Sequence, residues 1–144
     1  MLKSVMDTFN LLVDCRKEII MRVKMMDELV KRFPFLPGYL EIQNGWYKLL
    51  YDLCENIEIK LNGKKYKNLF KVEQVKQKYG QLRFYTNICE NNNMYNNLVE
   101  LIENFEERSL GICEFCGENG KTIWENRWAY VKCEKCQNKE GKTK

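Results

Sequence analysis

The sequence predicts an α+β fold with a small appended module, and three observations support this prediction. Apolar residues recur at spacings of three and four in three segments, which is typical of amphipathic helices. A segment between the second and third of these alternates around one glycine, as two paired strands do. Four cysteines fall in two CxxC pairs near the C-terminus. With 144 residues, 44% of them hydrophobic, the chain can bury a core.

The first predicted helix covers residues 2–33. Its apolar residues follow spacings of three, four and seven, interrupted once where Arg16 takes an apolar position. Pro34 and Pro37 end it. A straight helix of this length spans roughly 45 Å, which is long for so small a domain. Two alternatives stay open: the helix bends and packs back, or it pairs with a second copy of itself.

The second predicted helix begins near Gly45, with Asn44 as its expected N-cap. Its apolar stripe includes Trp46 and Cys54, and we therefore expect both side chains to lie in the core.

Two antiparallel strands are then expected over about 70–78 and 82–87, joined around Tyr79-Gly80-Gln81. A third helix is expected over about 94–110, with Glu106 and its acidic neighbours on a solvated face. These elements predict an N-terminal helical segment (1–38), an α+β core (39–110), a ribbon (111–138) and a disordered tail (139–144).

The cysteine pairs predict a metal site of the zinc-ribbon type, because two CxxC turns separated by sixteen residues can surround one ion tetrahedrally. Zinc is the expected cofactor, and iron is the competitor because a rubredoxin-type site also uses two such pairs. Four protein ligands leave no open position, so the site should be structural. Of Trp124 and Trp128, between the pairs, we expect one to pack on the main domain and the other to be exposed. The expected ligands are Cys113, Cys116, Cys133 and Cys136.

Several classes of function are disfavoured by what the sequence lacks. It has no histidine, which removes the usual general base near neutral pH, and no glycine-rich phosphate loop. We therefore expect a protein that is not an enzyme. No apolar run approaches the roughly 18 residues of a membrane helix, and the N-terminus lacks the apolar centre of a signal peptide. We expect a cytoplasmic protein with no membrane partner.

Charge is concentrated in the strand region. Residues 60–85 hold eight basic residues and one acid, Glu73, so this segment carries +7 in a chain whose net charge is +4. Such segregation is typical of a surface that meets an anionic partner.

Alternation along the strands suggests where that surface lies. If Val75 packs inward with Leu82 and Phe84, the cations between them face outward together. Such a group can neutralise phosphates and stack on bases, so we expect a nucleic acid or nucleotide ligand. Alternatively, the lysines are a solvated face that discourages edge-to-edge pairing, or they pair with acids of the third helix. The predicted ligand-binding residues are Lys76, Lys78, Tyr79, Arg83 and Tyr85.

Over roughly residues 44–136 the chain resembles a group of small phage and prophage proteins with a zinc knuckle. Gln77 departs from their pattern, which has Glu there, and Gln81 stands where it has a second Gly. The matching pieces are Gly45-Trp46, Leu53-Cys54, Gln74-Val75-Lys76, Lys78-Tyr79-Gly80, Leu82-Arg83-Phe84-Tyr85, Ser109 and Cys113-Glu114-x-Cys116-Gly117.

The resemblance implies a phage context, in the host cell's cytoplasm, and a shared fold, but no particular chemistry. Two functions follow as hypotheses. The first is a non-enzymatic accessory protein that binds a phosphate-bearing ligand through the basic strands, in a process such as countering host defence. The second is a protein–protein interaction module that uses residues 2–33 to form a homo-oligomer or to bind a host protein.

Overall fold

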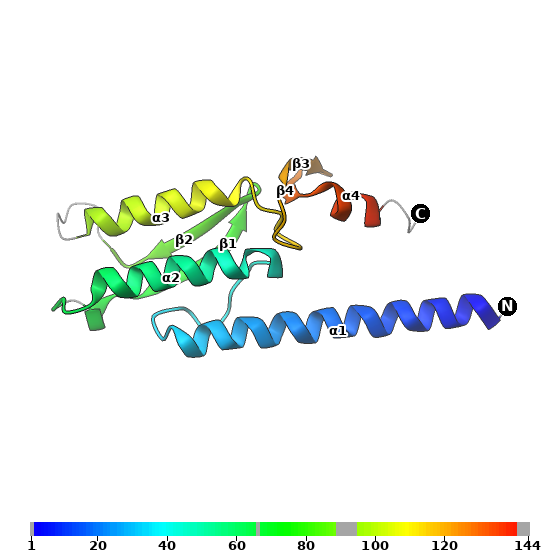
Figure 1. Cartoon of the computed structure of the whole chain (residues 1–144), viewed down its shortest axis with the longest axis horizontal. Coiled ribbons are helices and arrows are strands. Elements are labelled where there is room, and N and C mark those ends of the chain that lie inside the picture. The colour runs from blue at the N-terminus through cyan, green and yellow to red at the C-terminus, as the bar shows by residue number, and fades with distance from the viewer. Residues whose placement is uncertain (1, 66, 89–94, 141–144) are drawn as a thin grey trace.

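The computed structural model describes residues 2–65, 67–88 and 95–140, and it has the predicted α+β architecture (Figure 1). Two short 3-10 turns, at Asn44–Trp46 and Lys67–Leu69, lie between the main elements. The main elements are α1 (Leu2–Arg32), α2 (Tyr47–Leu61), β1 (Val72–Lys78), β2 (Gln81–Thr86), α3 (Asn96–Ser109), β3 (Lys121–Glu125), β4 (Trp128–Lys132) and α4 (Glu134–Glu140).

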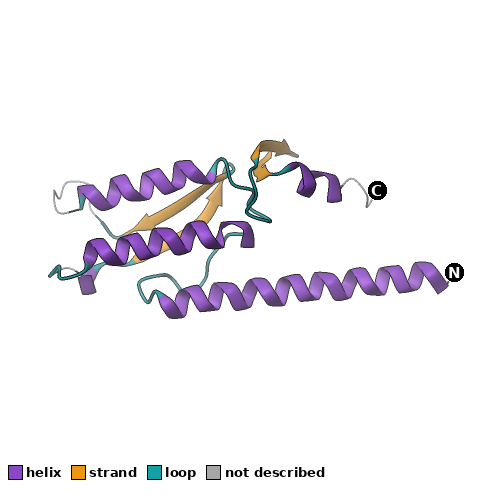
Figure 2. Ribbon diagram, in the orientation of Figure 1, coloured by secondary structure: helices purple, strands orange, loops and turns teal. Residues whose placement is uncertain are grey.

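The core lies between helices and the β1–β2 hairpin. Helices α2 and α3 run side by side against one face of the hairpin (Figure 2). On that face Val75, Leu82 and Phe84 are buried, as their alternation in the sequence predicts. Trp46 and Cys54 are fully buried in the same cluster, which confirms both as core residues.

A segment before α2 closes the free edge of β1. The Glu41 N–H donates to the Val75 carbonyl at 2.9 Å, and the Gln77 N–H donates to the Glu41 carbonyl at 3.2 Å. Further along, the Val72 N–H donates to the Phe35 carbonyl at 2.9 Å. The backbone groups that an edge strand would offer to another chain are therefore used within this one.

Side chains of α3 close the edge of β2. The Leu82 N–H donates to Ser109 Oγ at 2.9 Å, and the Phe84 N–H donates to Glu106 Oε1 at 2.8 Å. Glu106 also pairs with Arg83 at 3.4 Å. The expectation that Glu106 lies on a solvated face is wrong, because this carboxylate satisfies a backbone donor that would otherwise be unpaired.

Glu106 should make stability depend on pH. Burial raises its pKa above 4.5, although the Phe84 N–H and Arg83 oppose the shift. A carboxyl group whose pKa is higher in the folded state than in the unfolded state stabilises the fold at pH values below its unfolded-state pKa. This contribution is lost as pH rises through its folded-state pKa. We expect the free energy of unfolding, measured by urea titration, to fall over that interval and to fall less in Glu106→Gln. An equal fall in both proteins would contradict this assignment.

Helix α1 is continuous from Leu2 to Arg32, so the chain does not bend back within it. Only its C-terminal part joins the core, through Met26 and Leu29, and Phe33 follows directly. The N-terminal half extends past α2 toward the side of the molecule that carries the ribbon (Figure 1).

Other details differ from the expectations. Asn44 is not the N-cap of α2: it begins a 3-10 turn, the helix is preceded by Trp46, and no side chain caps it. Trp124 and Trp128 are both 66% exposed, because the hairpin that carries them projects from the core. Helix α4 continues to Glu140, two residues into the expected tail, and residues 141–144 lie outside the described ones.

Candidate metal centre

The four cysteines meet at one point. Cys113 and Cys116 lie in the turn that follows α3, Cys133 follows β4, and Cys136 lies in α4. Their sulfur atoms all lie within 4.8 Å of one another, and the Sγ atoms of Cys116 and Cys133 are 3.5 Å apart. A tetrahedral zinc site with Zn–S bonds of about 2.3 Å places its sulfurs about 3.8 Å apart. The cluster is therefore positioned to hold one metal ion, and its chemistry is consistent with zinc.

Each cysteine pair is shaped by backbone hydrogen bonds. The Gly117 N–H donates to the Cys113 carbonyl at 2.9 Å, and Gly117 has a φ of 82°, which suits glycine. In the second pair the Cys136 N–H lies 3.4 Å from Cys133 Sγ and lowers the pKa of that thiol to about 7. Burial raises the pKa of Cys116 and that of Cys136. The hydrogen bond from the Cys136 N–H thus favours the thiolate form of Cys133, which is the form that binds a metal.

A two-stranded hairpin connects the cysteine pairs. Strands β3 and β4 are antiparallel and are joined by Asn126 and Arg127, whose φ angles of 49° and 70° are those of a tight primed turn. Ala129 and Val131 are buried against the core. The hairpin thus anchors the second cysteine pair to the main domain.

Gly45 and Trp46 hold the first cysteine pair from the other side. The Gly45 N–H donates to the Glu114 carbonyl at 2.8 Å, and Trp46 Nε1 donates to the Ile112 carbonyl at 2.9 Å. A Cβ on residue 45 would lie 2.1 Å from the Cys113 carbonyl oxygen, so only glycine allows this approach. These contacts make Gly45 and Trp46 supports of the first cysteine pair, a link that spacing alone did not reveal.

Glu114 is a second residue whose role the sequence did not indicate. Its buried carboxylate accepts hydrogen bonds from the Val131 N–H at 2.9 Å and the Gln77 amide at 3.4 Å. Gln77 also donates to the Ala129 carbonyl. Burial raises the pKa of Glu114, and these donors oppose the shift. The side-chain amide of Gln77 supplies the donor that this arrangement needs.

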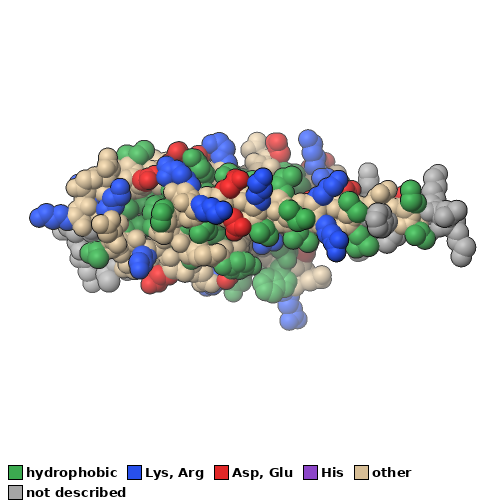
Figure 3. Space-filling view, turned by 90° about the horizontal axis from the view of Figure 1, so that it is seen from below, with side chains coloured by type: hydrophobic (Ala, Val, Ile, Leu, Met, Phe, Trp, Pro, Cys, Tyr) green, Lys and Arg blue, Asp and Glu red, His purple; other side chains and the backbone are tan. Residues whose placement is uncertain are grey.

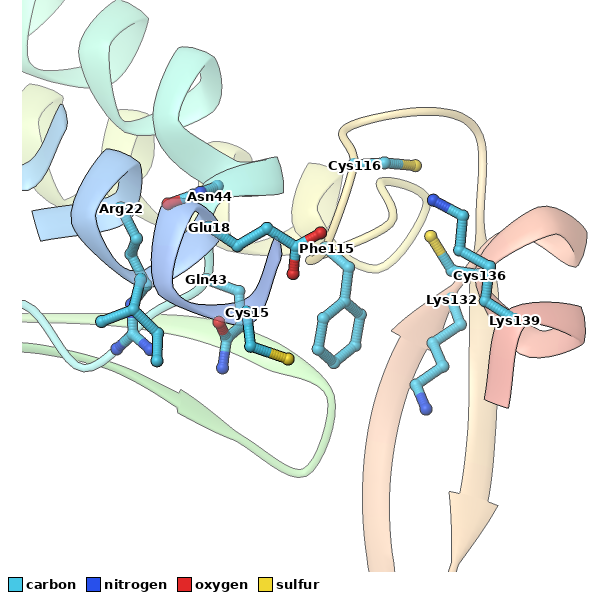
Figure 4. A pocket seen from close by; sticks show the side chains of 11 residues that line it. Cys15, Glu18, Arg22, Gln43, Asn44, Phe115, Cys116, Lys132, Cys136 and Lys139 are labelled. Carbon is cyan, nitrogen blue, oxygen red and sulfur yellow. The ribbon is translucent and has the colours of Figure 1, made fainter. Parts of the chain in front are cut away.

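A pocket of about 520 Å³ separates the ribbon from α1 (Figure 4). Cys15, Glu18 and Arg22 of α1 line one side, and Phe115 of the first cysteine pair lines the other. Buried Lys132 places Nζ 5.1 Å from the Phe115 ring and 3.1 Å from a Glu125 oxygen. The exposed ligand Cys116 also lines this pocket.

The predicted ligand-binding residues lie on the hairpin face that the helices leave open. Lys76 and Arg83 are directly opposite each other across the two strands. Lys76 Nζ lies 5.6 Å from the Tyr85 ring, and Lys78 Nζ lies 5.9 Å from the ring of Tyr79 at the turn. The structure therefore brings Lys76, Arg83 and Tyr85 together, while Lys78 and Tyr79 extend the group to the tip.

This face is not uniformly basic. Arg83 is paired with Glu106, and the open hollow of about 590 Å³ beside Lys76 also includes Glu41 and Glu73. Tyr39 lies at the same hollow and is exposed. The face therefore combines two solvent-accessible aromatic rings with lysines that lie beside them and with nearby carboxylates.

Comparison with protein-family models, curated proteins and solved structures finds no match for this chain. Among the described residues, no helix combines the length and apolar character needed to cross a membrane.

Proposed function

We propose that this protein binds a phosphate-bearing ligand, specifically an oligonucleotide strand, on the open face of the β1–β2 hairpin. One observation supports this most directly. Both edges of the hairpin are closed by the chain itself, through Glu41 on one side and Ser109 and Glu106 on the other. Protection against edge pairing therefore does not account for the cations on this face.

The chemistry of the face suits such a ligand. Lys76 and Lys78 supply charge for phosphates, and Tyr85 and Tyr79 supply rings on which bases can stack. Tyr79 is exposed at the turn, and the hollow beside Lys76 is open. An open face accommodates an extended strand better than it encloses a single nucleotide. In the phage context that the resemblance implies, the partner would be a nucleic acid of the host or the phage.

The metal centre has a supporting role in this proposal. Four cysteine ligands leave an ion no position for substrate, so the site stabilises the fold and performs no reaction. Cys133 directly follows β4, whose Ala129 carbonyl bonds to Gln77 of β1. The ion would thus hold the β1–β2 hairpin in place, through β4, and would not contact the ligand.

We expect Lys76→Ala/Lys78→Ala to weaken binding of a fluorescent single-stranded oligonucleotide by at least about tenfold, measured by anisotropy. Losing two phosphate contacts should also reduce the slope of log affinity against log salt by about 1.4. Tyr85→Ala should weaken binding by a similar factor through lost stacking. Arg83 is left intact, because its removal would leave the half-buried Glu106 unpaired.

The matched control is Lys64→Ala/Lys67→Ala, which removes the same charge from exposed positions of the basic segment outside the hairpin face. It should bind nearly as well as the unaltered protein. Equal weakening in both double variants would show that net charge alone attracts the strand. Absence of binding by the unaltered protein would exclude the proposal.

A further inference from the structure

The N-terminal half of α1 carries an apolar stripe that no other described part of the chain covers. Figure 3, which views the molecule from the α1 side, shows hydrophobic side chains along this half of the helix. They are large, and each is between 54% and 67% exposed. The stripe consists of Val5, Met6, Leu12, Ile19, Ile20 and Val23.

The stripe lies beside the face of α1 that packs on the core and partly overlaps it. Met26, Leu29 and the partly buried Val30 are the residues of α1 that pack in or against the core. At 100° per residue, the mean direction of the stripe is rotated by about 80° from the mean direction of those three residues. Ile19 and Val23 line a hollow with Tyr39 and Leu40, yet they remain 61% and 54% exposed.

A helix projecting in this way needs a partner. Residues 2–23 would span roughly 33 Å. Helices in water owe most of their stability to the packing of an amphipathic face rather than to propensity. Six such side chains, at roughly 100 Å² each, approach the roughly 800 Å² per partner that a specific interface buries.

We propose that the partner is a second copy of this chain, paired through α1 in an antiparallel two-helix coiled coil. Within the stripe, Val5, Leu12 and Ile19 repeat every seven residues, and Val23 follows Ile19 by four residues. A sustained seven-residue repeat is the pattern of a helix that pairs with another helix along its length. The same stripe on a second copy presents the same repeat, so a two-fold axis satisfies both helices.

Arg16 sets the orientation. It occupies a stripe position in the middle of the exposed half and is itself exposed. A parallel, in-register pair would place Arg16 against Arg16 of the second copy, and like charges in contact are destabilising. An antiparallel pair centred near residue 14 instead places Arg16 beside Leu12 of the second copy, and Val5 beside Val23. The guanidinium can then reach solvent while its stem covers the leucine.

The oligomeric state tests the interface, with sedimentation equilibrium of the full chain as the measurement. The unaltered protein should be a dimer, and Leu12→Lys/Ile20→Lys should be a monomer with reduced helical circular dichroism. The matched control, Asn10→Lys/Met21→Lys, adds the same charge and removes one exposed apolar residue on the other side of α1, and it should remain a dimer. A monomeric unaltered protein, or dimerisation that survives Leu12→Lys/Ile20→Lys, would overturn the proposal.

Cross-linking tests the orientation. In a Cys15→Ser background, one chain carries Met6→Cys and another carries Ile20→Cys. After mixing and re-equilibration, a short bismaleimide should join the two different chains, because an antiparallel pair brings positions 6 and 20 together. A Cys15→Ser chain without the new cysteine reports any background reaction. Efficient joining of the Met6→Cys chain to itself would show a parallel pair and overturn the antiparallel arrangement.

Discussion

A chain that cannot hold an ion at the four-cysteine cluster should have an unfolded ribbon and a less stable domain. Structural zinc sites contribute on the order of 10 kcal/mol of binding free energy that is available only to the folded chain. Val131 of β4 belongs to the main core, so disorder in the ribbon would also open that core. We expect Cys133→Ser to lose its bound ion, measured by native mass spectrometry, and to melt at a lower temperature with a broader transition.

Cys15→Ser is the matched control, since Cys15 is exposed and lies outside the four-cysteine cluster. It should keep one ion per chain and an unchanged melting temperature. Metal analysis of the same samples identifies zinc or iron directly. An unchanged melting temperature in Cys133→Ser would show that the cluster does not stabilise the fold.

Gly45→Ala should be the most damaging glycine-to-alanine change among the glycines that the structure describes. The added Cβ would lie 2.1 Å from the Cys113 carbonyl oxygen and 2.7 Å from that of Glu114. Both atoms are backbone, so no side-chain rotation relieves the clash, and the turn that carries two metal ligands must move. We expect a loss of more than about 4 kcal/mol in the free energy of unfolding, or failure to fold, measured by urea denaturation.

Gly38→Ala is the matched control, because a Cβ on residue 38 would meet no atom within 4 Å. It should change stability by less than about 0.5 kcal/mol. If Gly45→Ala were equally mild, the first cysteine pair would have to be held less closely against α2 than the structure indicates.

Periodicity was sufficient to predict helices α1, α2 and α3, the β1–β2 hairpin and the inner face of that hairpin. Val75, Leu82 and Phe84 are buried because a strand with one covered face must alternate, and this rule is local. The four cysteines of the metal centre could be predicted equally well, because the CxxC spacing itself encodes a turn with two converging sulfurs. Both predictions depend on residues close together in the sequence.

The contacts that join the modules could not be predicted in this way. Glu106 looks like one acid among several on a helix, yet its position opposite β2 makes it an acceptor for the Phe84 N–H. Gly45 looks like the start of a helix, and its role depends on a turn nearly seventy residues later. Asn44 was predicted as the N-cap of α2, but it begins the 3-10 turn that precedes the helix.

Strand β1 serves the two sides of the molecule at once. Gln77 holds the ribbon through Glu114 and Ala129, while Lys76 and Lys78, its neighbours in sequence, belong to the opposite face. One strand therefore connects the metal centre with the lysine face. If an anion on the lysines favours the geometry that holds the metal, thermodynamic reciprocity requires the metal to strengthen anion binding by the same factor. In a cell that withholds or supplies metal, this strand would make metal availability a control on ligand occupancy.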